Sequence, residues 1–546
     1  MSKRIRTISL LMALVVLLAA AMTLPPDSAL AQSGSLWSRS YGGSSDDHAY
    51  SVQQTTDGGY IVAGSTNSFG AGVSDYWVLK LASNGNVQWQ KTYGGRSGDS
   101  AHTIQQTVDE GYIMAGFTTS FGAGKSDYWV LKLSPNGSVD WQKTYGGSGW
   151  DYAYSIQQTT DGGYIVAGST GSFGAGKSDY WILKLASNGN AQWQKTYGGS
   201  GEDSAYYIQQ TTEGGYIVAG STGSFGAGSS DYWVLKLDSN GDAEWQKTYG
   251  GSYLENARCI EQTTGGGYIV AGSTDSFGAG GSDFWVLRLT SNGNIQWQKT
   301  YGDINHDYAY STQQATDGGY IVAGYTKSFG AGNNDYWVLK LASNGNVQWL
   351  KSYRGIDNDY AYSVQQTIDG GHIVAGQTES FGVGGEDLWV LRIDEDGSIP
   401  ECQLGVDTDI TITNTQSTVA DATPTTNNTI ASISMPSYSL IDSECNTNTQ
   451  CYYTPAAPIV DEPNPEEGFA SILVFLETAY GFKDGEGIMG WTVYNPLWPS
   501  QSNSLKTLHV GRGYWIYVRE ACILQYGSST YELGAGWNLI GWIPQL

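Results

Sequence analysis

The chain has 546 residues and a formal net charge of -25. Such an excess of acid excludes a nucleic-acid-binding protein, whose partner phosphates need Lys and Arg, and disfavours docking on anionic membranes. With 74 glycines, 20 tryptophans, 38 tyrosines and only 13 prolines, the composition is typical of short strands joined by tight turns.

The first residues predict an export signal. Three basic residues among the first six precede an apolar stretch at 8–24, and Ala29 and Ala31 are spaced as a small-x-small cleavage site. We therefore expect residues 1–31 to be removed, leaving a secreted or surface-held chain that begins at Gln32 without a membrane span. An uncleaved anchor is the alternative, but the apolar stretch is short for one.

A seven-residue stretch, DYWVLKL from Asp75, then sets a period for most of the chain. It returns every 52 residues without insertion or deletion, six more times with small changes. The later copies begin at Asp127, Asp179, Asp231, Asp283, Asp335 and Asp387. Seven copies of one supersecondary unit decide the architecture before local propensity does.

Each unit predicts four strands, which in the first copy are 49–55, 60–65, 75–81 and 87–93. Glycine-containing turns join the first strand to the second and the third to the fourth, as in hairpins, and a longer loop joins the middle two. Seven repeats of four antiparallel strands predict an all-β fold, a seven-bladed β-propeller. A solenoid is the rival, but it favours helices or shorter coils and a distinct cap at each end.

The two ends of the repeat array complement each other. Residues 36–43 match a fourth strand, with Trp37 one period before Trp89. The seventh unit lacks that strand, since its expected Trp is missing at 401 and Pro400 cannot donate to a ladder. We expect the N-terminal strand to complete the last blade and close a propeller that spans 32–402.

The motifs D-x-A-Y-S, D-G-G-Y-I-V-A-G, S-D-Y-W-V-L-K-L and N-G-N-V-Q-W-Q-K-T-Y-G-G resemble the secreted bacterial and archaeal seven-bladed β-propeller repeat family. The resemblance covers about residues 36–401. It implies a propeller on exported or surface proteins, mostly without an assigned activity.

An acidic residue stands two positions before the first-strand Ala in every unit. These residues are Asp47, Asp99, Asp151, Asp203, Glu255, Asp307 and Asp359. Because the first strand should lie innermost, they predict a ring of carboxylates near a channel mouth, with the third-strand aspartates in a wider ring. Hard cations such as Ca²⁺ bind clustered carboxylates, so this ring is our candidate metal site. The alternative is that each carboxylate caps its own loop.

Departures from repetition mark where a single ligand site could be encoded. Trp150, Tyr152 and His48 lie in or just after the connections between units, and we take them as ligand-face candidates. The regular Trp77 and Trp89 and their equivalents are interpreted as packing between blades, with a sugar platform as the alternative. Phe69 and its equivalents are either loop anchors or a ligand-contact surface.

The tail reads as a Thr-, Ser- and Asn-rich spacer and linker at 403–467, followed by a small β-rich domain at 468–546. A short helix is predicted at 469–480, and strands at 511–518 and 536–542. The last two resemble a β-rich module at the ends of large bacterial surface proteins, which implies attachment or accessory binding; a structural cap is the alternative.

Five cysteines are present, and export makes disulfides possible. One bridge is predicted among Cys402, Cys445 and Cys451, with the pairing left open, and Cys259 is interpreted as a core thiol. None of the five histidines falls in a Ser-His-Asp or metal-binding pattern.

We therefore expect a monomeric, non-catalytic propeller for binding or display, with an extracellular protein or glycan as partner and Ca²⁺ as the one candidate cofactor. A carbohydrate-binding or carbohydrate-cleaving propeller is the alternative. Another enzyme, such as a quinone-dependent dehydrogenase, is less favoured, because nearly perfect sevenfold repetition argues against one asymmetric catalytic centre.

Overall fold

The computed structural model describes residues 36–330 and 333–399, and beyond these only the backbone of short strands between 405 and 541. The signal segment and the predicted disulfide lie outside the described residues. All helices and strands assigned in the described part of the chain are β-strands; it contains no helix. No helix there is long and apolar enough to cross a membrane. The chain divides into two compact units, Met1–Gln450 and Cys451–Leu546.

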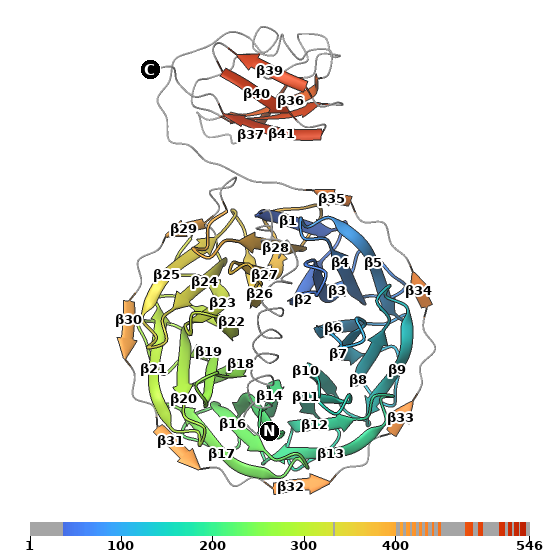
Figure 1. Ribbon diagram of the computed structural model, residues 1–546, viewed down its shortest axis with the longest axis vertical. Coiled ribbons are helices and arrows are strands. Elements are labelled where there is room, and N and C mark those ends of the chain that lie inside the picture. The colour runs from blue at the N-terminus through green and yellow to red at the C-terminus, as the bar shows by residue number, and fades with distance from the viewer. Residues whose placement is uncertain are drawn as a thin grey trace, which may run out of the picture. The chain divides into compact units, whose positions relative to one another are not determined.

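The first unit contains the predicted seven-bladed β-propeller (Figure 1). The inner strands are β2 (Asp47–Gln54), β6 (Asp99–Gln106), β10 (Asp151–Gln158), β14 (Asp203–Gln210), β18 (Glu255–Gln262), β22 (Asp307–Gln314) and β26 (Asp359–Gln366). The second strands are β3 (Tyr60–Thr66), β7 (Tyr112–Thr118), β11 (Tyr164–Thr170), β15 (Tyr216–Thr222), β19 (Tyr268–Thr274), β23 (Tyr320–Thr326) and β27 (His372–Thr378).

The third strands are β4 (Asp75–Leu81), β8 (Asp127–Leu133), β12 (Asp179–Leu185), β16 (Asp231–Leu237), β20 (Asp283–Leu289), β24 (Asp335–Leu341) and β28 (Asp387–Ile393). The outer strands are β1 (Trp37–Gly42), β5 (Val87–Gly94), β9 (Val139–Gly146), β13 (Ala191–Gly198), β17 (Ala243–Gly250), β21 (Ile295–Gly302) and β25 (Val347–Tyr353). Neighbouring strands of a blade are antiparallel, as hairpin connections require.

The predicted closure of the ring is confirmed. β1 pairs antiparallel with β28, with Trp37 opposite Arg392, so the first described residues form the outer strand of the seventh blade. The indole N–H of Trp389 donates to Ser38 Oγ at 2.9 Å across this junction. The N-terminal strand therefore joins the last blade as any outer strand joins its own.

The core lies between the blades and is built from the third-strand motif. Trp77 is fully buried, and its ring lies 5.3 Å from that of Phe69. The Tyr76 hydroxyl donates to the carbonyl of Trp129 in the next blade at 3.0 Å. Trp77 and its equivalents are thus packing residues rather than a sugar platform, and Phe69 anchors its loop. Trp89 is half-buried, 5.9 Å from Tyr112 of the next blade.

The two faces of the ring carry different connections. The turns between inner and second strands and between third and outer strands form one face, which we call the turn face. The connections from one blade to the next and the loops between second and third strands form the other, which we call the loop face.

Glutamines join neighbouring blades on the turn face. The Gln106 N–H donates to Gln53 Oε1 at 2.6 Å, and the Thr56 N–H donates to Gln106 Oε1 at 2.9 Å. Both bonds recur at all seven interfaces, with Glu261 accepting in one of them. The closed sets of bonds hold every blade to both neighbours.

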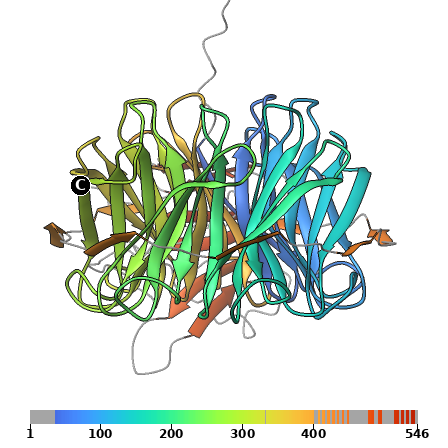
Figure 2. The same ribbon diagram turned by 90° about the horizontal axis from the view of Figure 1, so that it is seen from below.

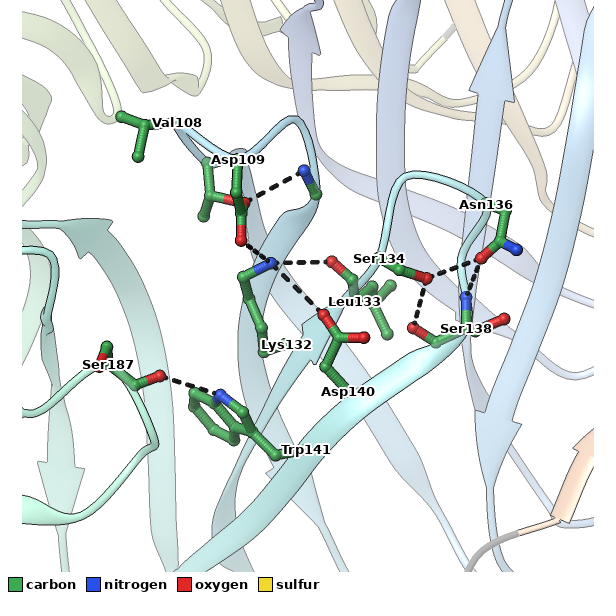
Figure 3. Close-up of polar contacts among 12 residues, drawn as sticks. Val108, Asp109, Lys132, Leu133, Ser134, Asn136, Ser138, Asp140, Trp141 and Ser187 are labelled. Carbon is green, nitrogen blue, oxygen red and sulfur yellow. Dashed lines mark hydrogen bonds and ion pairs between the residues drawn. The ribbon is translucent and has the colours of Figure 1, made fainter.

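A buried cation also lies under most turns on this face. Lys132 is 5% exposed, and its ammonium contacts Asp109 at 3.0 Å and Asp140 at 3.7 Å (Figure 3). Where the turn lacks its acid, at Gly265, an arginine replaces the lysine, and Arg288 donates to the Gly266 carbonyl at 2.6 Å. Six of the seven buried third-strand cations therefore pair with a carboxylate of their own blade.

Seven further strands surround the ring. They are β29 (Gly405–Asp407), β30 (Thr411–Asn414), β31 (Thr418–Asp421), β32 (Thr425–Asn428), β33 (Ser432–Ser434), β34 (Ser439–Ile441) and β35 (Asn446–Asn448). Each pairs antiparallel with a different outer strand, so every blade gains a fifth strand. We call these strands the belt; they lie outside the blades in Figure 1 and between the two faces in Figure 2.

The belt follows a period of its own. Thr411 pairs with Gly302, Thr418 with Gly250, and Thr425 with Gly198. Seven residues of belt therefore correspond to one 52-residue blade, and the belt passes the blades in reverse order. Because an outer strand has unpaired backbone groups at its free edge, the belt satisfies a pairing site on each blade.

The second unit contains a four-stranded sheet, in the order β37 (Gly490–Tyr494), β36 (Leu476–Lys483), β38 (Gly513–Val518) and β41 (Gly536–Gly541). A hairpin of β39 (Cys522–Tyr526) and β40 (Ser529–Leu533) accompanies it. The strands predicted near β38 and β41 are confirmed, and they pair. The predicted helix is wrong from residue 476 onward. β36 pairs there on both sides, so pairing with neighbouring strands outweighs the local helix propensity.

Candidate functional site

Each inner-ring carboxylate holds the loop face together from inside. Asp151 is fully buried at the start of β10, where its Oδ2 accepts from the Gly147 N–H at 3.0 Å and from Ser172 Oγ at 2.7 Å. Its Oδ1 accepts from the Thr170 hydroxyl. The carboxylate thereby ties the connection between blades to the loop between the second and third strands, which is the capping role that Asp favours.

The other six members of the ring occupy equivalent places. Each is buried and accepts from its own loops; they are Asp47, Asp99, Asp203, Glu255, Asp307 and Asp359. Among the described residues, no group of three or more His, Cys, Asp or Glu side chains is arranged to hold a metal ion. The Ca²⁺ site stays a prediction. The hydrogen bonds are those expected if each carboxylate caps its own loop.

The third-strand aspartates face the inner-ring carboxylates across the blade interfaces. Both Asp179 Oδ1 and Asp203 Oδ2 border Gly198, where an added Cβ would lie 1.8 Å from the first and 2.9 Å from the second. Only glycine fits such a place. Burial, with a contribution from the Asp203 charge, raises the pKa of Asp179 to about 6.

A closed ring of seven side chains fills the axis of the propeller. Its members are Tyr50, His102, Tyr154, Tyr206, Arg258, Tyr310 and Tyr362, one from each inner strand. Successive ring centroids are 5.0–5.4 Å apart around six of these side chains, and the Arg258 guanidinium bridges Tyr206 and Tyr310. We call this set the axial ring.

A β-bulge in every inner strand positions the axial ring. In the third blade, Ala153 is opposite Gly168 and Ser155 is opposite Ala167, so Tyr154 is the extra residue without a partner. The same shift occurs in the other six blades. Because a bulge re-aims the residue it inserts, all seven side chains turn toward the axis.

Aromatic side chains continue from the axial ring toward the loop face in two groups. In one, Trp150 stacks on Tyr152 at 6.1 Å, and Tyr152 stacks on Tyr154 at 6.4 Å. In the other, Tyr360 stacks on Tyr362 at 6.3 Å and lies 4.7 Å from Tyr325. Their order along the strands, above the axial ring, places both groups at the mouth of the axis on the loop face.

Polar groups complete the mouth beside the second aromatic group. His48 Nε2 contacts Glu386 Oε2, and Tyr50 approaches His48 Nδ1 at 3.2 Å. The hydrogen bond from His48 holds the pKa of Glu386 below its usual value. The structure therefore brings Trp150 and Tyr152 together as predicted ligand-face residues, and it places His48 in a separate polar cluster.

One constellation resembles a catalytic triad in composition only. The Ser282 hydroxyl donates to Asp275, and it lies 3.3 Å from His306 Nδ1. Ser282 is fully buried, and His306 Nδ1 accepts from the Ser282 backbone N–H at 3.1 Å. A nucleophilic serine needs an accessible hydroxyl that donates to the histidine, so this arrangement stabilises a loop.

Differences between the repeats gather at this face. At the position of Trp150 the seven units hold seven different residues, namely Asp46, Gly98, Trp150, Glu202, Leu254, His306 and Asn358. At the position of Gln54, on the turn face, all seven units hold glutamine. The blades therefore differ from one another in sequence mainly on the loop face.

Alternation of residue types predicts neither the axial ring nor the seven paired strands of the belt. The signal for the axial ring is the Tyr of D-x-A-Y, which alternation alone assigns to the wrong face because the bulge shifts it. The signal for the belt is a seven-residue period in the tail, with Ile412, Val419 and Ile433 at one position. That period is faint in a segment rich in Thr, Ser and Asn.

Comparisons with known proteins give limited guidance. No protein-family model matches the chain. The regulatory protein FlaEY of Caulobacter vibrioides is 24% identical over 307 residues, which are 51% of this chain and 31% of FlaEY. This chain therefore spans under a third of that relative's length.

Two solved structures match the chain at low similarity. Sqt1 from Chaetomium thermophilum gives a TM-score of 0.36 at 12% identity, covering 69% of this chain and 90% of that one. A protein of unknown function from Dyadobacter fermentans gives 0.36 at 12% identity, covering 65% and 97%. Similarity at this level carries no argument about function.

Proposed function

We propose that this chain is an exported, non-catalytic binding protein that engages an extracellular protein or surface polymer through its loop face. The observation that carries the proposal is the contrast between the two faces. Seven different residues occupy the Trp150 position, whereas the Gln54 position of the turn face never changes. Residues that only close the ring must repeat, since every interface needs the same bonds. Residues that differ are free to recognise a partner.

Exposed apolar side chains on the loop face support this proposal. Tyr253 is 62% exposed, Ile304 is 73% exposed and Ile356 is 80% exposed, each on a connection between blades. Trp150 is 47% exposed beside the aromatic mouth. Exposed aromatic and aliphatic residues around a preformed scaffold are typical of binding surfaces.

The N-terminal pattern of basic, apolar and small residues supports export. Sequencing of the secreted protein should find Gln32 as its first residue. A protein that remains cell-associated with its first residues intact would contradict export.

The binding proposal is tested with a matched pair of variants. Purified mature protein is applied to an array of extracellular glycans and to surface proteins of the producing cell, and retained partners are titrated. Trp150→Ala on the loop face should weaken retention at least tenfold. Val108→Ala, at a turn-face residue that is 91% exposed, should leave it unchanged. Equal loss in both variants, or loss only in Val108→Ala, would place binding elsewhere.

A further inference from the structure

One member of the axial ring differs from the rest in charge. Five of the seven positions hold tyrosine, one holds His102 and one holds Arg258. Burial lowers the pKa of His102 to about 4, and its Nδ1 lies 2.8 Å from the Ala153 carbonyl, so it is neutral near pH 7. Arg258 is therefore the single charged member of the axial ring.

The Arg258 guanidinium lies between two tyrosine faces. Its central carbon is 4.1 Å from the ring centroid of Tyr206 and 5.4 Å from that of Tyr310. Within the described part of the chain it has neither a hydrogen-bond acceptor nor an ion-pair partner, and none of its nitrogens is sealed from solvent. Five N–H donors in a planar fork are thus held in place without a partner.

The carboxylates nearest in the strand order form no ion pair with Arg258 among the described residues. Glu255, on the same strand, accepts from the Gly251 N–H at 2.8 Å and from the Thr274 hydroxyl at 2.9 Å. Asp203 and Asp307, on the flanking strands, are buried and bonded to their own loops. Charges on the exposed surface of the protein are screened beyond about 8 Å at physiological salt.

The residues above Arg258 at the mouth are small and polar. Tyr152 stacks on Tyr154 and Tyr360 stacks on Tyr362, so the residue two before a member of the axial ring lies above it. The same repeat places Asn256 above Arg258 and Ser204 above Tyr206. Elsewhere the same position holds the large side chains Tyr152, Tyr308 and Tyr360, and also His48 and Ser100. Small polar side chains thus border the arginine, and aromatic rings border most of the rest of the mouth.

We infer that Arg258 binds the carboxylate of an acidic saccharide, a polymer or oligomer that contains uronic acid, seated on the aromatic mouth. This inference rests on the proposed function and names its ligand class. A carboxylate matches the planar fork of a guanidinium in two parallel hydrogen bonds. Sugar C–H faces pack against aromatic rings, and sugar hydroxyls meet tyrosine, serine and asparagine side chains. A saccharide uses all of these groups, whereas a peptide carboxyl terminus uses chiefly the arginine.

The test compares two probes of the same sugar backbone, one with charged carboxylates and one with neutral methyl esters. Trigalacturonate and its fully methyl-esterified form are titrated calorimetrically into the mature full-length protein at 150 mM salt. The acid should bind about tenfold or more tightly than the ester, as a charge-assisted bidentate contact supplies. Arg258→Tyr, which installs the residue of five sister blades, should abolish the preference without lowering the melting temperature. Arg258→Lys should keep part of it.

Several results would overturn the inference. They are equal affinity for acid and ester, absence of binding to the acid, or an unchanged preference in Arg258→Tyr. Preference for a peptide with a free over an amidated C-terminus, without saccharide binding, would also reject a saccharide ligand. If an uncharged glycan or a protein binds, and Trp150→Ala but not Arg258→Tyr weakens it, the proposed function stands and the acidic-ligand inference falls.

Discussion

Replacing Asp179 by Asn should stabilise the propeller at alkaline pH. Asp179 is 1% exposed, its Oδ2 accepts from the Ala175 N–H at 2.9 Å, and its Oδ1 accepts no hydrogen bond from the described residues. The same Oδ1 borders Gly198 together with a carboxylate oxygen of Asp203. Asn keeps an acceptor for Ala175 and presents an NH₂ donor, in place of a second negative oxygen, toward Asp203.

The magnitude follows from the raised pKa. Ionising a carboxyl with a pKa of about 6 in place of 3.8 costs about 3 kcal/mol at a pH above both values. Relaxation around the charge reduces this, and we expect Asp179→Asn to raise the free energy of unfolding by about 1–2 kcal/mol at pH 8. The penalty is absent below about pH 4 and grows as the pH rises through 6. The gain from Asn should therefore vanish near pH 4.

The assay is urea unfolding of both proteins at pH 8 and near pH 4, and Asp161→Asn is the control of opposite sign. Burial alone would raise the pKa of Asp161, but hydrogen bonds from Lys184 and Thr159 outweigh it and hold the value at about 2. Removing that charge should destabilise the fold at pH 8, with the difference shrinking only as the pH falls toward 2. Destabilisation by Asp179→Asn of equal size at both pH values would refute the argument.

Three further predictions concern the turns, the belt and the cation. Glu110 has a φ of 65°, and its six sister residues are all glycine with φ of 76–92°, so Glu110→Gly should stabilise by about 1 kcal/mol. Gly162→Glu, at a site with nothing within 4 Å of an added Cβ, should destabilise the fold by as much. Urea unfolding should therefore show midpoint shifts of opposite sign for the two variants. Shifts of the same sign would contradict the argument that a positive φ strains Glu110. Thr413→Pro removes a backbone donor within β30 and should speed hydrogen exchange in β21, whereas Gln416→Pro, between belt strands, should not. If Ca²⁺ binds the folded ring, chelation should lower the melting temperature, and an unchanged melting temperature would remove the ion from the account.

The blade and its closure could be predicted because their signals repeat. A period of 52 residues, Asn-Gly turns and the match between Trp37 and Trp89 each report on backbone pairing, which depends little on neighbours outside the unit. Burial of the third-strand Trp followed from the same pattern.

The axial ring could not be predicted, because a bulge shifts the alternation of side chains without changing any residue type. Tyr154 is the inserted residue of its strand, and no glycine or proline beside it announces the bulge. The belt could not be predicted for another reason. Its strands have only three or four residues, and they form by pairing with the free edges of seven outer strands, which exist only in the folded ring.

A fold of seven nearly identical blades offers few positions at which one substitution creates a specific binding site. The axis is the most favourable of them. A substitution at the rim changes one loop in seven and leaves six similar loops beside it. On the axis, by contrast, all seven inner strands contribute to one set of touching side chains. Having Arg258 in place of one tyrosine therefore makes the whole set asymmetric and positively charged. The bonds that close the ring lie on the opposite face and are untouched by such an exchange. The fold therefore permits recognition to change at the mouth while the ring itself stays closed.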